Sequence, residues 1–372
     1  MRDDDYVPGR DGSLWLRARP DAVGMDAAGL GEAVAFAEEH ETPWGRNLHR
    51  VIADGHFEEG AHAEIIGPTR PRGDPNGLVL RFGRVVAQWG DTRRVDMTFS
   101  VAKSYLSILA GLAADDGLIA DLDEPVGRSV DDGGFEGAQN RTITWRHLLQ
   151  QTSEWEGTLW GKPDLVDRNR DLSLEGRGKA KGTHRDLAAP GEYWEYNDVR
   201  VNRLSLALLR RFGRALPAVF RTRIMDPIGA SSSWEWHGYR NSSVEIGGAP
   251  VQSVSGGGHW GGGVFIHAED QARIGLLMMR RGCWGERRLL SEHWIDLSTR
   301  PCPIKPDYGF LWWLNTDRLS FPSASPESFF AIGAGGNLTW IDPASGIVAV
   351  LRWIDRASVD GFLARVMAAV RG

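Results

Sequence analysis

The chain has 372 residues, of which 43 are basic and 49 acidic, so its formal net charge is −6. This length and a hydrophobic content of 42% indicate a globular protein of two or three domains and exclude a mostly disordered chain. The acidic balance gives no reason to expect nucleic acid or an anionic membrane as a partner. No apolar run is long enough to span a bilayer.

Two cysteines, Cys283 and Cys302, form neither a disulfide framework nor a metal-binding pattern. The N-terminus is acidic and lacks the apolar segment of a signal peptide. We therefore expect a cytoplasmic protein without a metal or a cofactor.

The first third of the chain predicts a helix, two strands and a second helix. Residues 26–40 have the apolar spacing of an amphipathic helix, and residues 77–90 indicate two short strands around a tight turn. Residues 100–114 are apolar on nearly every side, which is typical of a buried helix.

The middle of the chain, residues 118–245, is helical and rich in loops. Residues 155–189 are polar and indicate either a mobile lid or a long surface excursion. Further helices are expected at 199–212 and 268–281, with glycine clusters at 256–258 and 261–263 between them.

The C-terminal region predicts strands at 329–340 and 347–354, followed by a helix at 359–370. Strands near both ends of the chain, with helices between them, suggest one sheet domain interrupted by an insertion. We expect residues 1–117 and 246–372 to form this sheet domain, residues 118–245 to form the helical insertion, and the active site to lie between them.

Ser100 and Lys103 lie three residues apart at the start of the apolar helix, which puts hydroxyl and amine on one face. A lysine desolvated in such a helix can lose its proton and serve as base for a serine nucleophile, whereas arginine cannot. Only five of the 43 basic residues are lysines, so a lysine here is informative. The competing interpretation is a helix-capping serine beside a lysine that reaches solvent.

Two later segments offer complementary chemistry. Tyr196 precedes an apolar helix, and a tyrosine beside a lysine can shuttle protons. The glycine-rich segment Ala331–Asn337 lets a substrate approach the backbone closely, although a tight bend explains it equally well. The 16 tryptophans supply flat apolar walls for a pocket, and simple core filling is the alternative for each.

In this order and spacing, these segments resemble the serine β-lactamase and penicillin-binding-protein superfamily. The similarity is greatest to the branch with class C β-lactamases, serine carboxylesterases and 6-aminohexanoate-dimer hydrolase. It covers roughly residues 25–370 and implies an α/β (α+β) fold, with an antiparallel sheet flanked by helices and an inserted helical domain. The segments that carry it are Thr98–Ser104, Ile143–Ser153, Pro190–Asp198, Gly261–Phe265 and Ala331–Gly336.

The resemblance implies that Ser100 is the nucleophile and Lys103 its base. Tyr196 would assist proton transfer to the leaving group and from the deacylating water. The oxyanion hole would consist of the N–H groups of Ser100 and Gly336. The residues expected to line the substrate pocket are Gly333, Gly335, Trp155, His259 and Trp260.

The sequence departs from the family pattern at two positions. Asp198 stands where the Tyr-x-Asn motif has asparagine. A carboxylate there would pair with Lys103 and hold it protonated, which favours a Tyr196 phenolate as base, while Asn197 is an alternative source of the amide. The third motif begins with Gly333 instead of lysine or histidine, so the group that meets a β-lactam carboxylate is missing unless His259 lies nearby.

We therefore predict a serine hydrolase of small amides or esters that works through a Ser100 acyl-enzyme. It would be an esterase or an amidase similar to 6-aminohexanoate-dimer hydrolase. The alternatives are β-lactamase or D-amino-peptidase activity, and a non-catalytic protein with the penicillin-binding fold. The expected partner is a small-molecule substrate, and the oligomeric state stays open.

Overall fold

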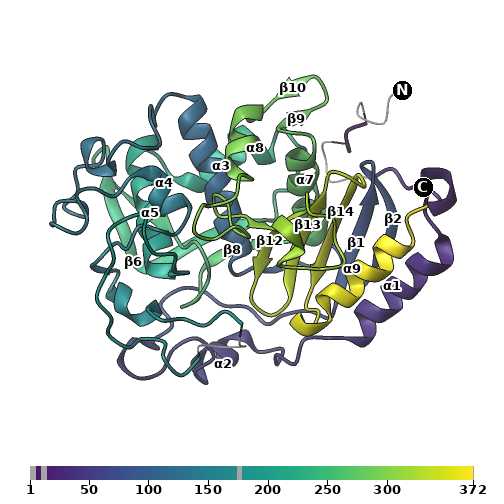
Figure 1. Cartoon of the computed structure of the whole chain (residues 1–372), viewed down its shortest axis with the longest axis horizontal. Coiled ribbons are helices and arrows are strands. Elements are labelled where there is room, and N and C mark those ends of the chain that lie inside the picture. The colour runs from purple at the N-terminus through teal and green to yellow at the C-terminus, as the bar shows by residue number, and fades with distance from the viewer. Residues whose placement is uncertain (1–5, 10–14, 174–177, 372) are drawn as a thin grey trace.

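Six strands from the two ends of the chain form one antiparallel sheet in the computed structural model, which describes residues 6–9, 15–173 and 178–371 (Figure 1). The strand order is β11-β12-β13-β14-β1-β2. Strands β1 and β14 come from opposite ends of the chain and pair with Val79 opposite Ala349. The strands are β1 (Asn76–Arg81), β2 (Arg84–Trp89), β11 (Trp313–Leu314), β12 (Phe329–Gly333), β13 (Asn337–Asp342) and β14 (Ile347–Arg352).

Most of the strand predictions near the termini are confirmed, with one difference. The region 329–340 holds two strands, because Gly335 and Gly336 both adopt positive φ, at 74° and 77°, and turn the chain back on itself. Glycine is the residue that takes up this backbone conformation without a steric penalty. The turn brings the end of β12 to the middle of the molecule.

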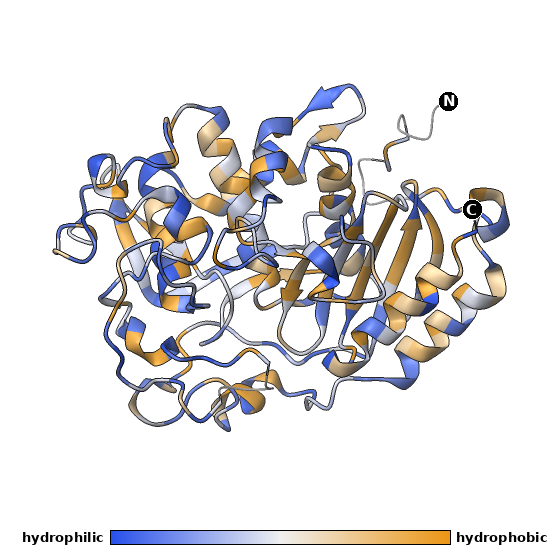
Figure 2. Ribbon diagram, viewed as in Figure 1, coloured by the Kyte–Doolittle hydropathy of each residue, from blue (hydrophilic) through white to orange (hydrophobic). Residues whose placement is uncertain are grey.

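Helices cover both faces of this sheet. The first and last long helices, α1 (Ala27–Glu39) and α9 (Val359–Ala368), lie side by side on one face (Figure 1). Helices α7 (Ala268–Met279) and α3 (Val101–Asp115) pack on the other face. The strands are accordingly hydrophobic along their length (Figure 2), and β13 and β14 are buried at every residue.

A second, four-stranded sheet has the order β3-β8-β6-β7. Its long strand β6 was expected to lie in a purely helical insertion, and the expected boundary at 245/246 cuts through the end of this strand. The alternation of β6 and β7 was not recognised in the sequence. The strands are β3 (Asp96–Met97), β6 (Glu235–Ile246), β7 (Ala249–Val254) and β8 (Gly263–Ile266).

Helix α3 runs through the centre of the molecule, and its residues 101–113 are all buried. A Cβ at Gly111 would lie 2.5–2.6 Å from ring atoms of Trp294, so this glycine allows α8 to pack closely against α3. The predicted buried helix is confirmed. The remaining long helix is α5 (Asp198–Phe212), and the short α-helices are α2 (Leu48–Ala53), α4 (Trp145–Leu149), α6 (Leu216–Phe220) and α8 (Glu292–Ser298).

The polar segment 155–189 is anchored by buried ion pairs in its described part. Arg168 Nε lies 2.8 Å from Asp164 Oδ2, and both side chains are almost fully buried. The segment contains β4 (Thr158–Leu159), β5 (Lys162–Pro163) and the 3-10 helix η5 (Asp164–Asp167). The first part of the segment, up to Arg168, therefore contributes to the interior, whereas most described residues from 171 to 189 are exposed or half-buried.

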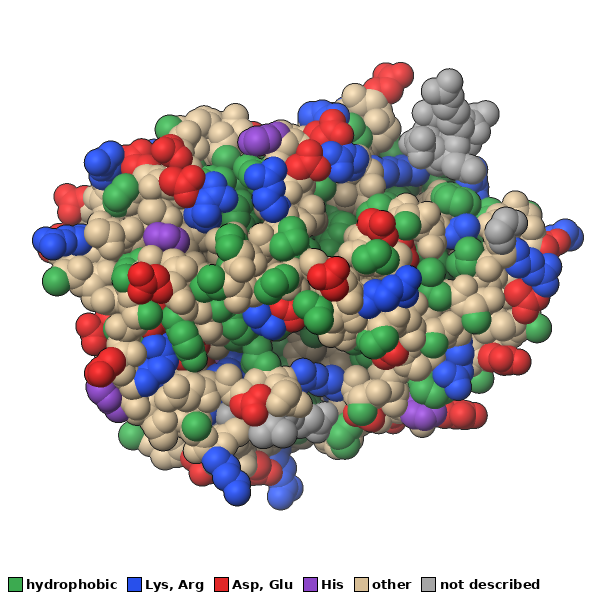
Figure 3. Space-filling view, in the orientation of Figure 1, with side chains coloured by type: hydrophobic (Ala, Val, Ile, Leu, Met, Phe, Trp, Pro, Cys, Tyr) green, Lys and Arg blue, Asp and Glu red, His purple; other side chains and the backbone are tan. Residues whose placement is uncertain are grey.

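The remaining strands form a small hairpin, β9 (Cys283–Trp284) and β10 (Arg287–Arg288). Acidic and basic side chains are interspersed over the visible face (Figure 3). Among the helices of the described residues, none combines the length and the apolar character needed to cross a membrane.

Candidate active site

Ser100 occupies the turn that leads into α3. The preceding residue, Phe99, has a φ of 51°, an uncommon left-handed conformation for an aromatic residue. Ser100 Oγ accepts a hydrogen bond of 2.9 Å from Lys103 Nζ and caps no backbone N–H. The interpretation of Ser100 as a capping serine beside a solvent-reaching lysine is therefore wrong, since Lys103 is only 1% exposed.

Lys103 is paired with the carboxylate expected from the sequence. Its Nζ lies 2.6 Å from Asp198 Oδ1, and both side chains are buried. Burial is the largest single influence and would lower the pKa of Lys103, but the charge of Asp198, its hydrogen bond and Tyr196 together outweigh burial, and the pKa is raised. Burial conversely opposes the charged form of Asp198, yet Lys103 and its other cationic neighbours hold the pKa of Asp198 well below its usual value. The resting pair is an ammonium and a carboxylate.

Tyr196 lies beside this ion pair. The Nζ of Lys103 is 4.8 Å from the centre of the Tyr196 ring, and the ring of Trp313 stacks on it at 5.7 Å. Tyr196 is 6% exposed. The structure therefore brings Tyr196 to the Ser100–Lys103 pair, although Tyr196 comes more than 90 residues later in the sequence.

Asn197 does not supply an amide to this centre. Its Oδ1 accepts hydrogen bonds from the backbone N–H groups of Val199 and Arg200 at the start of α5, and its Nδ2 donates to the carbonyl of Asp164 at 2.8 Å. The alternative role considered for Asn197 is thus replaced by helix capping. Asp198 is the residue that contacts Lys103.

Arg170 is a site residue that the sequence did not single out. It comes from the segment after η5, and its NH1 donates to Asp198 Oδ2 at 2.8 Å. Its guanidinium carbon lies 5.4 Å from the centre of the Tyr196 ring. Asp198 therefore has one cation on each of its two oxygens.

His259, whose place the sequence left open, lies beside Asp198 and Glu58. Its Nδ1 is 3.4 Å from Asp198 Oδ2, and its Nε2 is 2.8 Å from Glu58 Oε1. The Trp260 ring stacks on His259 at 4.1 Å, and its Nε1 donates to the His62 carbonyl, so that Trp260 supports the histidine from the core.

Glu58, Asp167 and His259 have the donor set and proximity of a candidate metal site. The ammonium of Lys181 already lies among them, 3.1 Å from Asp167 Oδ1 and in direct contact with Glu58. Burial raises the pKa of Asp167, but Lys181 above all brings it below the ordinary value. The geometry thus shows a cation position filled by the protein's own lysine. Lys181 is, like Lys103, one of only five lysines in the chain, so the scarcity of lysine was a signal that could have pointed to Lys181 as well.

The glycine-rich strand end lies against the nucleophile at Gly333. A Cβ at Gly333 would overlap the Thr98 carbonyl and lie 3.2 Å from the backbone nitrogen of Ser100. The corresponding position on Gly335 faces the rings of Trp44 and Trp353, and that on Gly336 faces the backbone of Ile354. Gly333 is therefore the residue of this segment that contacts the nucleophile turn, and the expected oxyanion residue Gly336 faces Ile354 instead.

Trp155, like Trp260, is an expected pocket residue that the structure places in the hydrophobic core. It is 4% exposed, its Nε1 donates to the carbonyl of Gly134 at 2.7 Å, and Gly157 packs against its ring. This tryptophan anchors the start of the polar segment 155–189. Its expected role as a pocket wall does not match this position, because its indole N–H is hydrogen-bonded and its ring is packed against other residues of the protein.

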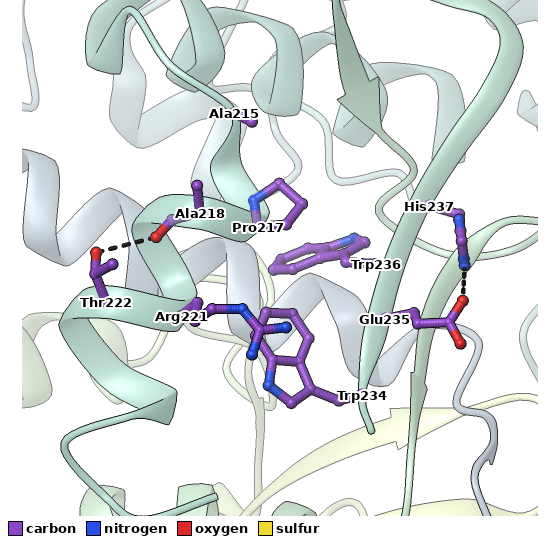
Figure 4. A pocket seen from close by; sticks show the side chains of 9 residues that line it. All are labelled: Ala215, Pro217, Ala218, Arg221, Thr222, Trp234, Glu235, Trp236 and His237. Carbon is purple, nitrogen blue, oxygen red and sulfur yellow. Dashed lines mark hydrogen bonds and ion pairs between the residues drawn. The ribbon is translucent and has the colours of Figure 1, made fainter. Parts of the chain in front are cut away.

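A hollow of about 440 Å³ lies between α6 and β6 and shares no residue with the Ser100 centre (Figure 4). Its walls are mostly apolar, and Arg221 lies over the ring of Trp234 at 4.7 Å. It contains none of the nucleophile, base or carboxylate groups described above. We therefore treat the Ser100 centre as the candidate active site.

The Beta-lactamase family model matches residues 79–357, which is well over half of the chain and includes Ser100, Lys103 and Tyr196. The chain therefore belongs to the Beta-lactamase family. This confirms the expected superfamily and its mixed fold of helices and antiparallel sheet.

Three solved structures illustrate the similarity. A family VIII carboxylesterase has a TM-score of 0.59 and 15% identity, over 96% of this chain and 98% of that chain. A penicillin-binding protein homologue from Caulobacter crescentus has a TM-score of 0.57 and 15% identity, over 95% and 98%. A D-stereospecific amidohydrolase from Streptomyces sp. has a TM-score of 0.55 and 16% identity, over 93% and 98%. At these identities the likeness establishes the fold.

Proposed function

We propose that this protein is a serine hydrolase that cleaves small esters or amides through an acyl-enzyme on Ser100. The observation that carries the proposal is the hydrogen bond between Ser100 Oγ and Lys103 Nζ at the start of a buried helix, with Tyr196 beside the same ammonium. A nucleophile, a proton-transfer pair and a helix N-terminus are the parts that acyl transfer needs.

In the first step, Ser100 Oγ attacks the substrate carbonyl carbon and its proton passes to the Lys103–Tyr196 pair. The oxyanion accepts hydrogen bonds from the N–H of Ser100 and from a second backbone N–H. We place this second donor at Ala334, directly after Gly333, because Gly333 is the residue beside the Ser100 backbone. Collapse breaks the bond to the alcohol or amine, which leaves with the proton. Water then repeats the sequence and releases the acid.

Asp198 sets a condition on this mechanism. An ammonium cannot accept the serine proton, so the Lys103–Tyr196 pair must lose one proton before Ser100 can react. Such a loss belongs to the coupled pair and not to one residue alone. Activity is therefore expected to rise with pH along an acid limb that reports this deprotonation.

The direct test uses a fluorophosphonate probe followed by peptide mass mapping. We expect covalent labelling of Ser100 and none in Ser100→Ala. That variant is expected to lose at least ~10³-fold in kcat on p-nitrophenyl butyrate. Its unfolding free energy is expected to change by less than ~1 kcal/mol, because Ser100 caps no N–H. A Ser100→Ala enzyme that keeps a third of the activity would contradict the proposal.

The buried Lys103–Asp198 ion pair also supports a second candidate, a binding protein that keeps the fold without turnover. In that case the ammonium would only fix the helix start. Absence of probe labelling together with measurable binding of small esters would favour this second function.

A further inference from the structure

Asp198 divides its two carboxylate oxygens between two cations. Oδ1 faces Lys103 Nζ at 2.6 Å, and Oδ2 faces Arg170 NH1 at 2.8 Å. The three side chains are 4%, 2% and 8% exposed, in the order Asp198, Lys103, Arg170. Solvent therefore screens this arrangement weakly, and each charge acts strongly on its neighbours.

A carboxylate in place of a neutral amide adds a negative charge next to Lys103. Taken alone, this charge would oppose the proton loss that the proposed mechanism needs. Arg170 adds a positive charge to the same carboxylate, which makes the Asp198–Arg170 pair neutral as a unit. The guanidinium also lies near Tyr196, the other half of the proton-transfer pair.

We infer that Arg170 is a positioning residue that neutralises Asp198, so that Asp198 and Arg170 together replace the neutral asparagine of the Tyr-x-Asn motif. This inference rests on the proposed function. It assigns a role in the reaction to the segment after η5. It also explains how Asp198 is compatible with catalysis.

The other groups around Lys103 leave this balance intact. Ser100 at the start of α3 and Tyr196 before α5 contact Lys103 directly. The segment between β7 and β8 places the uncharged Gly257 against Lys103. The same segment carries His259, which contacts Asp198. Further out, the carboxylates of Asp167 and Glu58 are paired with Lys181, and Asp167 also lies 3.6 Å from Arg170.

Counted over the described residues of the cluster, three carboxylates face three cations in the resting state. The carboxylates are those of Glu58, Asp167 and Asp198, and the cations are Lys103, Arg170 and Lys181. Removal of Arg170 alone would leave one carboxylate in excess beside Lys103. Removal of Asp198 alone would leave one cation in excess.

The test is a double-mutant cycle with the rate of fluorophosphonate labelling as a function of pH, which needs no knowledge of the substrate. In Arg170→Gln the excess negative charge disfavours deprotonation, so the acid limb is expected to move up by about 1 pH unit or more. In Asp198→Asn the excess positive charge favours deprotonation, so the limb is expected to move down by a similar amount. In the double variant the limb is expected to return to within about half a unit of wild type.

Two controls separate charge from folding. Arg170→Lys keeps the charge and is expected to keep the wild-type limb. Arg168→Gln removes a neighbouring buried arginine that pairs with Asp164 instead, and its limb is expected to stay in place even if the segment is weakened. Thermal unfolding of every variant identifies any that fail to fold. If Arg170→Gln fails to fold, the direction in which Asp198→Asn moves the acid limb still tests the charge balance.

The outcomes distinguish the two proposals. If Ser100 of the wild type is not labelled at any pH, the proposed function fails. If Ser100 is labelled but folded Arg170→Gln leaves the acid limb unmoved, or the acid limb of the double variant differs from that of the wild type by clearly more than about half a pH unit, the role of Arg170 is overturned. Opposite shifts that cancel in the double variant support it.

Discussion

Gly257 lies directly on the ion pair at the centre of the site. Its φ is not positive, so its backbone conformation does not require glycine. The position requires glycine because there is no room for a side chain. A Cβ would lie 2.7 Å from Lys103 Nζ and would overlap the carboxylate of Asp198. The absence of a side chain at Gly257 is therefore what allows the two charges to meet under this segment.

We expect Gly257→Ala to lower kcat/KM on p-nitrophenyl butyrate by at least ~10-fold, because the methyl group must separate Lys103 from Asp198. Crowding of this kind typically costs about 1–3 kcal/mol of stability. A matched control is Gly31→Ala in α1, where a Cβ meets nothing within 4 Å. That control is expected to keep full activity and gain about 0.5–1 kcal/mol in helix stability. Equal activity of the two variants would contradict the role of Gly257.

Phe99 shows how neighbouring residues hold the nucleophile. Its left-handed backbone costs on the order of 1–3 kcal/mol and needs support from its surroundings. The rings of Trp44 and Trp353 meet it edge-on, at centroid distances of 5.3 Å and 6.5 Å. The same two tryptophans face Gly335, so one aromatic group supports both the nucleophile turn and the glycine-rich turn.

At the scale of elements, the segment 155–189 is tied to the rest of the protein through Lys181. Its Nζ donates to the carbonyls of Val166 and Phe57 at 2.8 Å and 3.1 Å and contacts the carboxylates of Glu58 and Asp167. The side chain is 1% exposed. One buried ammonium thus joins η5 to the chain that follows α2.

Lys181→Met is expected to lower the free energy of unfolding by about 3–5 kcal/mol, because it leaves two buried carboxylates without their cation. The matched control is Lys179→Met, an exposed position two residues away, for which a change within about 0.5 kcal/mol is expected. Urea unfolding of the two variants checks this. Similar stabilities would mean that the segment is held elsewhere.

The end of β12 carries no charge that could meet an anionic substrate. From Phe329 to Gly333 the strand carries no cation, and Arg170 beside Asp198 is already shared between Asp198 and Asp167. A β-lactam carboxylate would lose its hydration here without gaining a free partner, whereas a neutral ester loses nothing comparable.

We therefore expect p-nitrophenyl butyrate to exceed nitrocefin by at least ~10²-fold in kcat/KM, which corresponds to about 2.7 kcal/mol. Parallel kinetics with the two substrates measure this ratio. If nitrocefin proves the better substrate, Arg170 must turn from Asp198 to the ligand, and the protein is then a β-lactamase by activity.

At the scale of the whole molecule, buried titratable groups make stability depend on pH. Burial above all, with help from the positive charge of Arg170, lowers the pKa of His56 from 6.5 to about 4. The unfolded chain therefore binds this proton at higher pH than the folded protein does. The stability that neutral His56 contributes is complete above pH 6.5 and is lost as the pH falls toward 4.

Between pH 7.5 and pH 5, we expect the wild type to lose about 2 kcal/mol more unfolding free energy than His56→Gln. His147 and His267 also have lowered pKa values, but they are present in both proteins and cancel in the comparison. Urea unfolding at the two pH values gives the difference. Equal losses in the two proteins would show that the pKa of His56 is the same in the folded and unfolded chains.

The sequence by itself predicted the long helices, most of the strands near the two ends of the chain, and the pairing of Ser100 with Lys103. The apolar pattern of 100–114 predicted a buried helix, and the spacing of Ser100 and Lys103 placed both on one helical turn, because these features depend on contacts three or four residues apart. The family motifs added Tyr196, and the substitution at Asp198 correctly predicted a partner for Lys103.

Only the tertiary structure decided what surrounds that pair. His259 contacts Glu58, 201 residues away in the sequence, and Arg170 contacts Asp198, 28 residues away. No periodic pattern in the sequence predicts either contact. The same holds for Gly257, whose small size matters because two distant elements converge beneath it. Local spacing specifies helices and strands, whereas the charge balance of the site arises from where folding brings distant side chains together.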